Sequence, residues 1–167
     1  GLVRSGALRG IAPMPFGDSG DLAVGQELHV GGFGADAQAV QVVSRGEFVG
    51  YWEYLLDSAV YAAPAFRDFG GAALISEGKL VGVGSILTTF ELSGVGRVPS
   101  NMIVPIDLLK AILQELIRTG RSGRPPRPWL GLNAADIQGR VVVTTVTPGG
   151  PAEQAGLRRG EAIGTIH

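Results

Sequence analysis

The chain has 167 residues, of which 45% are hydrophobic, enough for one ordinary core or for one core with a small partial domain. Its formal net charge of -1 gives no reason to expect nucleic acid or an anionic membrane as a partner. Cysteine is absent, which excludes disulfides, thiolate metal sites and a cysteine nucleophile. No apolar run approaches the ~20 residues of a membrane span.

Short apolar runs separated by glycine fill the chain as far as about Leu92 and predict a β-barrel or β-sandwich. The second of these runs ends at Arg45-Gly46, and Glu77-Gly78 reads as the turn of a hairpin. Strands are expected at residues 26–30, 39–44, 72–76, 79–84 and 101–104. An aromatic cluster, Phe48, Tyr51, Trp52 and Tyr54, fits either the core of the barrel or a surface for a partner.

The spacing of apolar residues changes to a helical period between Asp107 and Thr119. Asp107 is expected to cap the start of this helix and Gly120 its end. The usual role of such an apolar stripe is packing, so we expect it to be buried against the barrel.

Residues 120–128 form an interdomain linker by composition, because prolines stiffen the segment and arginines keep it solvated. A small basic docking patch is the alternative interpretation of the same residues. Beyond it, a strand is expected at 140–146 and a short helix at 152–157.

Several motifs, in the same order and spacing, resemble the HtrA/Deg family of trypsin-like serine proteases. The segment 69–83, which begins Phe69-Gly70-Gly71, is similar to the nucleophile region of that family, Gly-Asn-Ser-Gly-Gly-Pro-Leu followed by a hairpin. Residues 15–26 and 104–110 are similar to two further family segments, the second of which opens the family's C-terminal helix. The segments 129–132, 147–152 and 155–161 look like the first half of the PDZ domain that follows in the family.

The resemblance implies a mainly β fold with a chymotrypsin-like second β-barrel and a C-terminal helix at residues 1–119. It also implies a linker at 120–128 and the N-terminal part of a PDZ-like domain at 129–167. By the same resemblance, the first barrel lies outside this chain, as do the triad histidine and aspartate. The family suggests the periplasm or cell envelope, although the residues themselves leave the localisation open.

The family's nucleophilic serine corresponds to Phe69 in this chain, and a phenyl ring cannot attack a carbonyl group. The two preceding positions are also changed, to Arg67 and Asp68, while Gly70 and Gly71 are retained. Arg67 lacks the freedom of glycine at positive φ, and Asp68 places a carboxylate where negative charge would develop. We therefore expect no catalytic residue in this loop. The Phe69 ring either fills the vacated site or belongs to an apolar surface that docks a peptide or a partner.

No other nucleophile is expected elsewhere in the chain. Ser19 lies in a Gly-Asp-Ser-Gly sequence, but the following Asp21 and its early position argue for a surface turn. No base is identified for Ser58 or Ser76. His29 lies in a strand of the second barrel, whereas the family's catalytic histidine lies in the first, so that role does not carry over to His29. The only other histidine, His167, is the last residue.

Backbone N–H groups of the Trp129-Leu130-Gly131-Leu132 segment could hold the C-terminal carboxylate of a peptide, as in a PDZ groove. No metal site or cofactor is expected, since the carboxylates and histidines show no ligand spacing.

Three hypotheses follow for the function. The first is an inactive HtrA-like protein, a pseudoprotease, that acts by binding a peptide or a protein. The second is a serine endopeptidase whose first barrel and triad histidine and aspartate lie outside this chain. The third is a purely structural or assembly module, built on the second barrel and the start of the PDZ domain. Separately, we expect the barrel face that normally packs on a partner barrel to be covered, either by a missing segment or by self-association.

Overall fold

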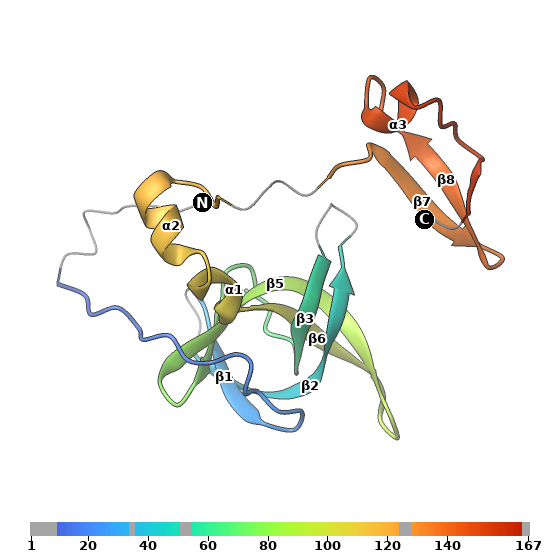
Figure 1. Cartoon of the computed structure of the whole chain (residues 1–167). Coiled ribbons are helices and arrows are strands. Elements are labelled where there is room, and N and C mark those ends of the chain that lie inside the picture. Colours follow the sequence, from blue (N-terminus) through green and yellow to red (C-terminus); the bar gives the residue numbers. More distant parts are fainter. Residues whose placement is uncertain (1–9, 34–35, 51–54, 124–127, 165–167) are drawn as a thin grey trace. The chain divides into compact units, whose positions relative to one another are not determined.

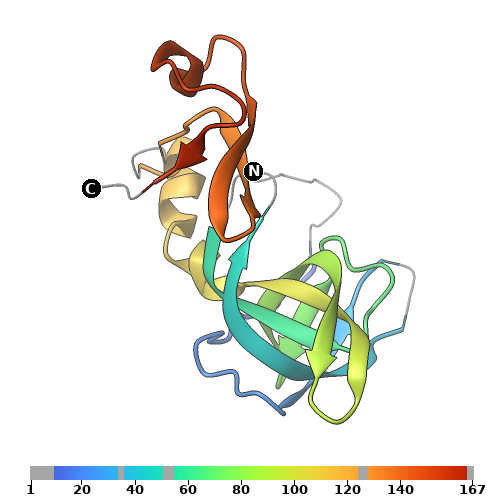
Figure 2. The ribbon, with the colours of Figure 1, turned by 90° about the vertical axis from the view of Figure 1, so that its right-hand side faces the viewer.

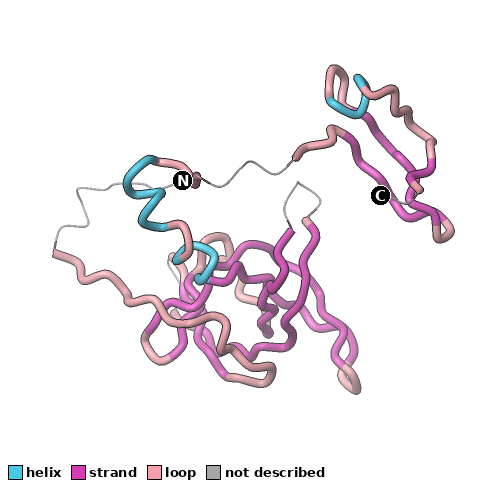
Figure 3. Tube along the Cα trace, viewed as in Figure 1, coloured by secondary structure: helices cyan, strands magenta, loops and turns pink. Residues whose placement is uncertain are grey.

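The computed structural model of the chain describes residues 10–33, 36–50, 55–123 and 128–164. It divides into two compact units, Gly1–Ser122 and Gly123–His167. The first unit holds a closed barrel and two short helices, and the second holds a three-stranded sheet with one short helix (Figure 1). Strands dominate the trace, so the expected mainly β fold is confirmed (Figure 3). The domain identities assigned to 1–119 and 129–167 stay predictions.

Six antiparallel strands form the barrel in the order β1-β2-β3-β6-β5-β4, and the pairing of β4 with β1 closes it. The long β5–β6 hairpin extends beyond the rest of the barrel in both views (Figures 1 and 2). The strands are β1 (Glu27–Gly31), β2 (Gln38–Val49), β3 (Leu55–Ala63), β4 (Ala73–Ser76), β5 (Lys79–Leu92) and β6 (Gly96–Pro105).

The core of the barrel follows from the alternation of side chains along the strands. In β1, for example, Leu28 and Val30 are buried, whereas Glu27 and His29 are exposed. One cluster of buried apolar residues fills the interior: Leu22, Leu28, Val30, Val40, Val42, Val60, Ala62, Phe66, Ala72, Leu74, Val81 and Ile103.

The predicted strands are present, but three of them run further than their local patterns indicate. The Glu77-Gly78 turn is confirmed, with both residues at positive φ (49° and 74°). The predicted end of β2 at Arg45-Gly46 is wrong, because the strand continues past two register shifts and stays paired with β3. The β5–β6 ladder likewise extends to Leu92 and Gly96. Of the aromatic cluster, only Phe48 lies within the described residues, and it is half-buried.

The expected single helix over 107–119 is two helices, α1 (Ile106–Lys110) and α2 (Leu113–Thr119). Ile112 breaks the helix with a φ of -125°, and its N–H bonds to Leu109 O. The predicted cap at Asp107 is wrong: Pro105 is the N-cap and makes no side-chain capping bond. The C-terminal cap is confirmed, because Gly120 adopts the left-handed conformation with φ 75°.

The apolar stripe of these helices is not packed as we expected. Ile106 of α1 is buried, but no residue of α2 is buried within the described part of the chain. Leu108 and Ile117 expose 47% and 55% of their surface. The break at Ile112 divides the stripe. The helix α1 packs against β5 and β6, and α2 projects beyond the end of the barrel in both views (Figures 1 and 2).

The second unit pairs β7 (Leu132–Ile137), β8 (Arg140–Val146) and β9 (Ala162–Ile163) in that order. The helix α3 (Pro151–Gln154) is shorter than the predicted 152–157 and begins with proline in its first turn. Among the described residues of this unit, the buried apolar ones are Val143 and Ala152. The strand β7 lies at one edge of the sheet.

None of the described helices is long and apolar enough to cross a membrane.

Candidate functional site

The loop between β3 and β4 holds the altered nucleophile position, and a side chain of the barrel, Asn101, hydrogen-bonds its backbone. Asn101 of β6 is 2% exposed and accepts a hydrogen bond from Phe66 N–H (2.7 Å). Its side-chain amide also donates to Phe66 O (3.3 Å). Both backbone groups of Phe66 are thereby satisfied inside the protein, where an unpaired polar group would be costly. Asn101 was not among the predicted site residues, although an amide within an apolar strand is a signal for such a role.

Backbone contacts fix the second half of the loop. Gly71 N–H donates to Gly84 O (2.9 Å), Gly84 N–H to Ala72 O (2.8 Å), and Ala72 N–H to Phe69 O (3.0 Å). A Cβ at Gly84 would lie 2.2 Å from Phe69 O, so only glycine allows β5 to pass this close. Gly71 turns the chain at φ 82°. The loop is therefore well formed even though its chemical residues differ from the family pattern.

The three altered side chains lie differently from one another. Arg67 and Asp68 are exposed, whereas Phe69 is half-buried. Glu77 and Gln138 are the non-glycine residues with positive φ in the described part of the chain, so Arg67 has an ordinary backbone conformation. Because the Phe69 ring is half-buried, both of its predicted roles, filling the vacated site and docking a ligand, stay predictions.

An open pocket of about 350 Å³ lies directly over this loop. Phe33, which is 100% exposed, lines this pocket and was not among the predicted site residues. An apolar side chain that follows two glycines after a strand was the available signal. The pocket is lined by Gly32, Phe33, Asp68, Gly70, Gly71 and Ala72.

Neither Ser58 nor Ser76 meets a base among the described residues. The Ser58 hydroxyl accepts from the Arg45 guanidinium (3.1 Å), and Ser76 lies 3.5 Å from the Gln26 amide. His29 is exposed on β1, paired across the sheet with Ala39 and Ile75. His167 lies outside the described residues.

The expected turn is present, with Asp18, Gly20 and Asp21 exposed, but Ser19 itself is buried, with only 1% of its surface exposed. Its hydroxyl donates to Asp107 Oδ2 (2.7 Å) and accepts from Asp107 N–H (3.2 Å). Gly20 N–H donates to the same carboxylate oxygen (2.9 Å). Ser19 thus hydrogen-bonds the start of α1, and among the described residues no imidazole is bonded to its hydroxyl.

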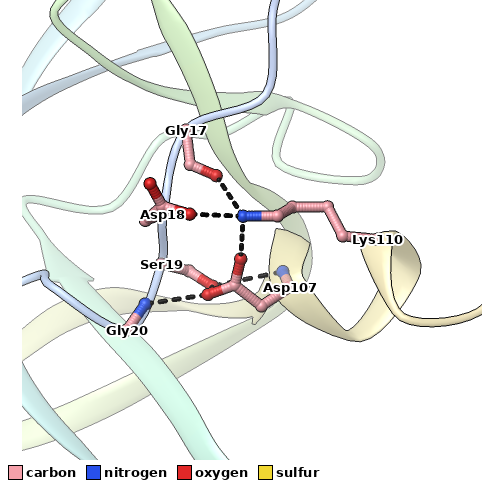
Figure 4. Close-up of polar contacts among 6 residues, drawn as sticks. All are labelled: Gly17, Asp18, Ser19, Gly20, Asp107 and Lys110. Carbon is pink, nitrogen blue, oxygen red and sulfur yellow. Dashed lines mark hydrogen bonds and ion pairs between the residues drawn. The ribbon is translucent and has the colours of Figure 1, made fainter.

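Lys110 completes this arrangement, which Figure 4 shows in full. Its ammonium donates to Gly17 O (3.0 Å) and pairs with Asp18 Oδ1 (2.5 Å) and Asp107 Oδ1 (2.6 Å). We call these residues the Asp107 clamp: Gly17, Asp18, Ser19, Gly20, Asp107 and Lys110. The clamp fastens the segment before β1 to the start of α1.

Charge and hydrogen bonding in the clamp stabilise its ionised groups. The Lys110 ammonium, with the Ser19 hydroxyl and Gly20 N–H, lowers the pKa of Asp107 to about 2 from its ordinary 3.8. Asp107 and then Asp18 raise the pKa of Lys110. Within the described residues, no group of three or more His, Asp or Glu side chains could hold a metal ion.

In the second unit, the Trp129-Leu130-Gly131-Leu132 segment precedes the edge strand β7. Its carbonyl groups are used internally, because Leu130 O accepts from Ala152 N–H (2.8 Å) and Gly131 O from Thr147 N–H (2.8 Å). Gly131 has φ 71°, and a Cβ there would lie 3.3 Å from the Trp129 ring. The side chains of Trp129 and Leu130 are exposed.

The chain is similar in sequence to several curated proteases. It is 28% identical over 177 residues to "Serine protease PepD" of Mycobacterium tuberculosis, covering 97% of this chain and 38% of the relative. It is 30% identical over 169 residues to "Protease Do-like 1, chloroplastic" of Arabidopsis thaliana, covering 89% and 36%. It is 33% identical over 111 residues to "Serine endoprotease DegS" of Salmonella typhimurium, covering 59% and 30%. No protein-family model matches the chain.

The chain therefore spans less than two fifths of the length of these relatives. Among solved structures, it resembles an HtrA-type protease with a decapeptide, with a TM-score of 0.53 and 21% identity. It resembles the same type of protease with a tripeptide at a TM-score of 0.55 and 21% identity. These matches cover 89% of this chain and 49% and 53% of those chains, and they support the fold.

Proposed function

Because this chain belongs to the HtrA/Deg family of trypsin-like serine proteases, we propose that it is an inactive member that acts by binding polypeptides. The observation that carries the proposal is Phe69 at the position of the nucleophile. Covalent catalysis in this fold begins with a hydroxyl group that a base deprotonates. A phenyl ring has no proton to lose and no lone pair to donate, so the first step has no reactant.

The retained scaffold around Phe69 supports a binding role over simple decay of the site. Asn101 still anchors the loop, and Gly84 still allows the close passage of β5. A loop held in one conformation loses little conformational entropy when a ligand binds. The pocket over the loop is therefore a preorganised concave surface.

The second unit adds a separate surface for a polypeptide. The internal bonds of the Trp129-Leu130-Gly131-Leu132 segment consume two of its carbonyl groups, and the N–H groups of Leu130 and Gly131 enter none of the hydrogen bonds found among the described residues. Such N–H groups can hold a carboxylate, and the neighbouring edge strand β7 can pair with an extended peptide. The two similar HtrA-type proteases were solved with peptides, which makes the same class of ligand a reasonable proposal here.

A covalent probe tests the loss of catalysis. The protein is incubated with a fluorophosphonate probe and with unfolded casein, beside an active trypsin-like protease. We expect no labelling and no cleavage above a heat-denatured control. Covalent labelling of any serine, or cleavage of casein that the probe inhibits, would refute the proposal.

A binding assay tests the second half of the proposal. Fluorescence anisotropy is measured with a library of labelled peptides that carry a free C-terminal carboxylate, and with the same peptides amidated. We expect saturable binding that weakens on amidation. A library with no saturable ligand would instead support a purely structural or assembly module.

The alternative is a serine endopeptidase whose first barrel and triad histidine and aspartate lie outside this chain. The specific observation in its favour is that the relatives are named as proteases and that the chain spans less than two fifths of their length. Probe labelling of the protein would favour this alternative.

A further inference from the structure

We infer that the pocket over the altered loop binds a positively charged side chain of a polypeptide, with the Asp68 carboxylate as its charged partner. The inference rests on the proposed function, since it names the part of a polypeptide that this site accepts. The pocket has a volume of about 350 Å³, enough for a lysine or arginine side chain but small for a folded partner.

The polar groups of the pocket favour a cation. Two of its backbone donors are consumed internally, since Gly71 N–H bonds to Gly84 O and Ala72 N–H bonds to Phe69 O. The Asp68 carboxylate is exposed, and the ion pairs among the described residues, both of Lys110, leave it without a charged partner. An anionic ligand would meet this charge as repulsion, whereas a cation gains from it.

The apolar wall of the pocket suits the stem of the same side chain. Phe33 is 100% exposed and offers both edge and face of its ring. Lysine and arginine bury their methylene stems on such surfaces, and their charged heads are attracted to an aromatic face. Arg67 is exposed next to Asp68 but does not line the pocket. Its charge weakens the attraction without blocking the site.

The backbone beneath Asp68 is held in place, so its carboxylate is presented from a fixed base. A Cβ on Gly32 would lie 3.1 Å from Asp68 O and 3.0 Å from the Phe66 ring, which shows how closely the loop rests on the end of β1. Asn101 fixes Phe66 two residues earlier. A carboxylate on a fixed backbone loses less conformational entropy on pairing than one on a mobile loop.

The test compares two short peptides that differ only in charge at one position. The isotope-labelled chain is titrated with acetyl-Ala-Ala-Lys-Ala-Ala-amide and with the same peptide carrying norleucine in place of lysine. We expect the lysine peptide to shift the amide signals of Gly70 and Gly71, with about three- to tenfold higher affinity at low salt. At about 0.5 M salt the preference should fall below roughly twofold, because the carboxylate is exposed.

Two variants assign the preference to one carboxylate. Asp68→Asn should abolish the difference between the peptides. The matched control Glu77→Gln, which removes an exposed carboxylate of the β4–β5 turn, should keep it. Arg67→Gln should raise the affinity for the lysine peptide by about twofold to threefold.

Equal affinity for the two peptides, no shift at Gly70 and Gly71, or a preference that survives in Asp68→Asn would each overturn the inference. The proposed function would stand in all three cases, since it is tested by the covalent probe and by the peptide library. Conversely, if the probe labels the protein and the lysine preference is intact, the proposed loss of catalysis is refuted and the inference about the pocket stands.

Discussion

Replacement of Asp107 by asparagine tests the physical role of the Asp107 clamp. The substitution keeps the size of the side chain and an oxygen that can still accept from Ser19 and Gly20. It removes the negative charge that faces the Lys110 ammonium at 2.6 Å. We therefore expect the segment before β1 to be held less firmly against α1.

The expected loss of stability follows from the pKa of Asp107, which falls from 3.8 to about 2 in the folded protein. At about 1.4 kcal/mol per pH unit, full conversion of this difference would give roughly 2.5 kcal/mol. The Asp107 side chain is 39% exposed, and solvent screening reduces such an interaction. We expect Asp107→Asn to lower the free energy of unfolding by about 1 kcal/mol at pH 7.

The sign of the pH dependence follows from the lowered pKa. A carboxyl group with a depressed folded pKa stabilises the protein above its unfolded pKa, near 3.8 for Asp107. That contribution is lost as the pH falls through about 2, because the folded carboxylate then becomes protonated. The difference between wild type and Asp107→Asn should therefore be present at pH 7 and nearly absent at pH 2.

The assay is urea unfolding followed by the methyl signals of Leu28, which is buried in the barrel unit. Asp57→Asn is the matched control, because Asp57 is an exposed carboxylate with no ion pair among the described residues. The reasoning is refuted if Asp57→Asn costs as much as Asp107→Asn. It is equally refuted if the effect of Asp107→Asn is the same at pH 2 and pH 7.

Three further predictions concern the altered loop, the peptide-binding segment and the exposed helix. Gly84→Ala should destabilise the barrel by about 1–3 kcal/mol in urea unfolding, because the new Cβ would lie 2.2 Å from Phe69 O. The control Gly46→Ala should cost far less, because a Cβ at Gly46 would meet no atom within 4 Å. Gly131→Ala should lower the affinity for peptides with a free C-terminal carboxylate at least about tenfold in fluorescence anisotropy, because alanine is strained at a φ of 71°. Unchanged affinity, or an equal loss in the control Gly164→Ala, would contradict this prediction. The exposed apolar face of α2 should cause self-association, which light scattering would show as a mass above 17.3 kDa. Ile117→Gln should lower that mass, and a monomeric wild type would contradict the prediction.

The local pattern predicted those features whose causes lie within a few residues. The Glu77-Gly78 turn needs two residues at positive φ, and Gly120 ends its helix for the same reason. The single helix over 107–119 was wrong because the apolar spacing continues across Ile112, where the backbone leaves the helical conformation. The prediction that β2 ends at Arg45 failed because the strand stays paired with β3 as far as Val49, opposite Leu55, a pairing that no local window contains.

By itself, the sequence determined the chemical character of the candidate site. An attacking group is a property of the residue type, so Phe69 excludes a nucleophile at that position whatever the fold around it. The tertiary structure alone decided which distant groups surround the loop. Asn101 reaches Phe66 across 35 residues, and Ser19 reaches Asp107 across 88, because closure of the barrel brings these strands and segments together. The pocket lined by Phe33 and Asp68 also depends on closure of the barrel. Phe33 follows β1 and Asp68 follows β3, so β2 and β3 separate the two residues in the sequence.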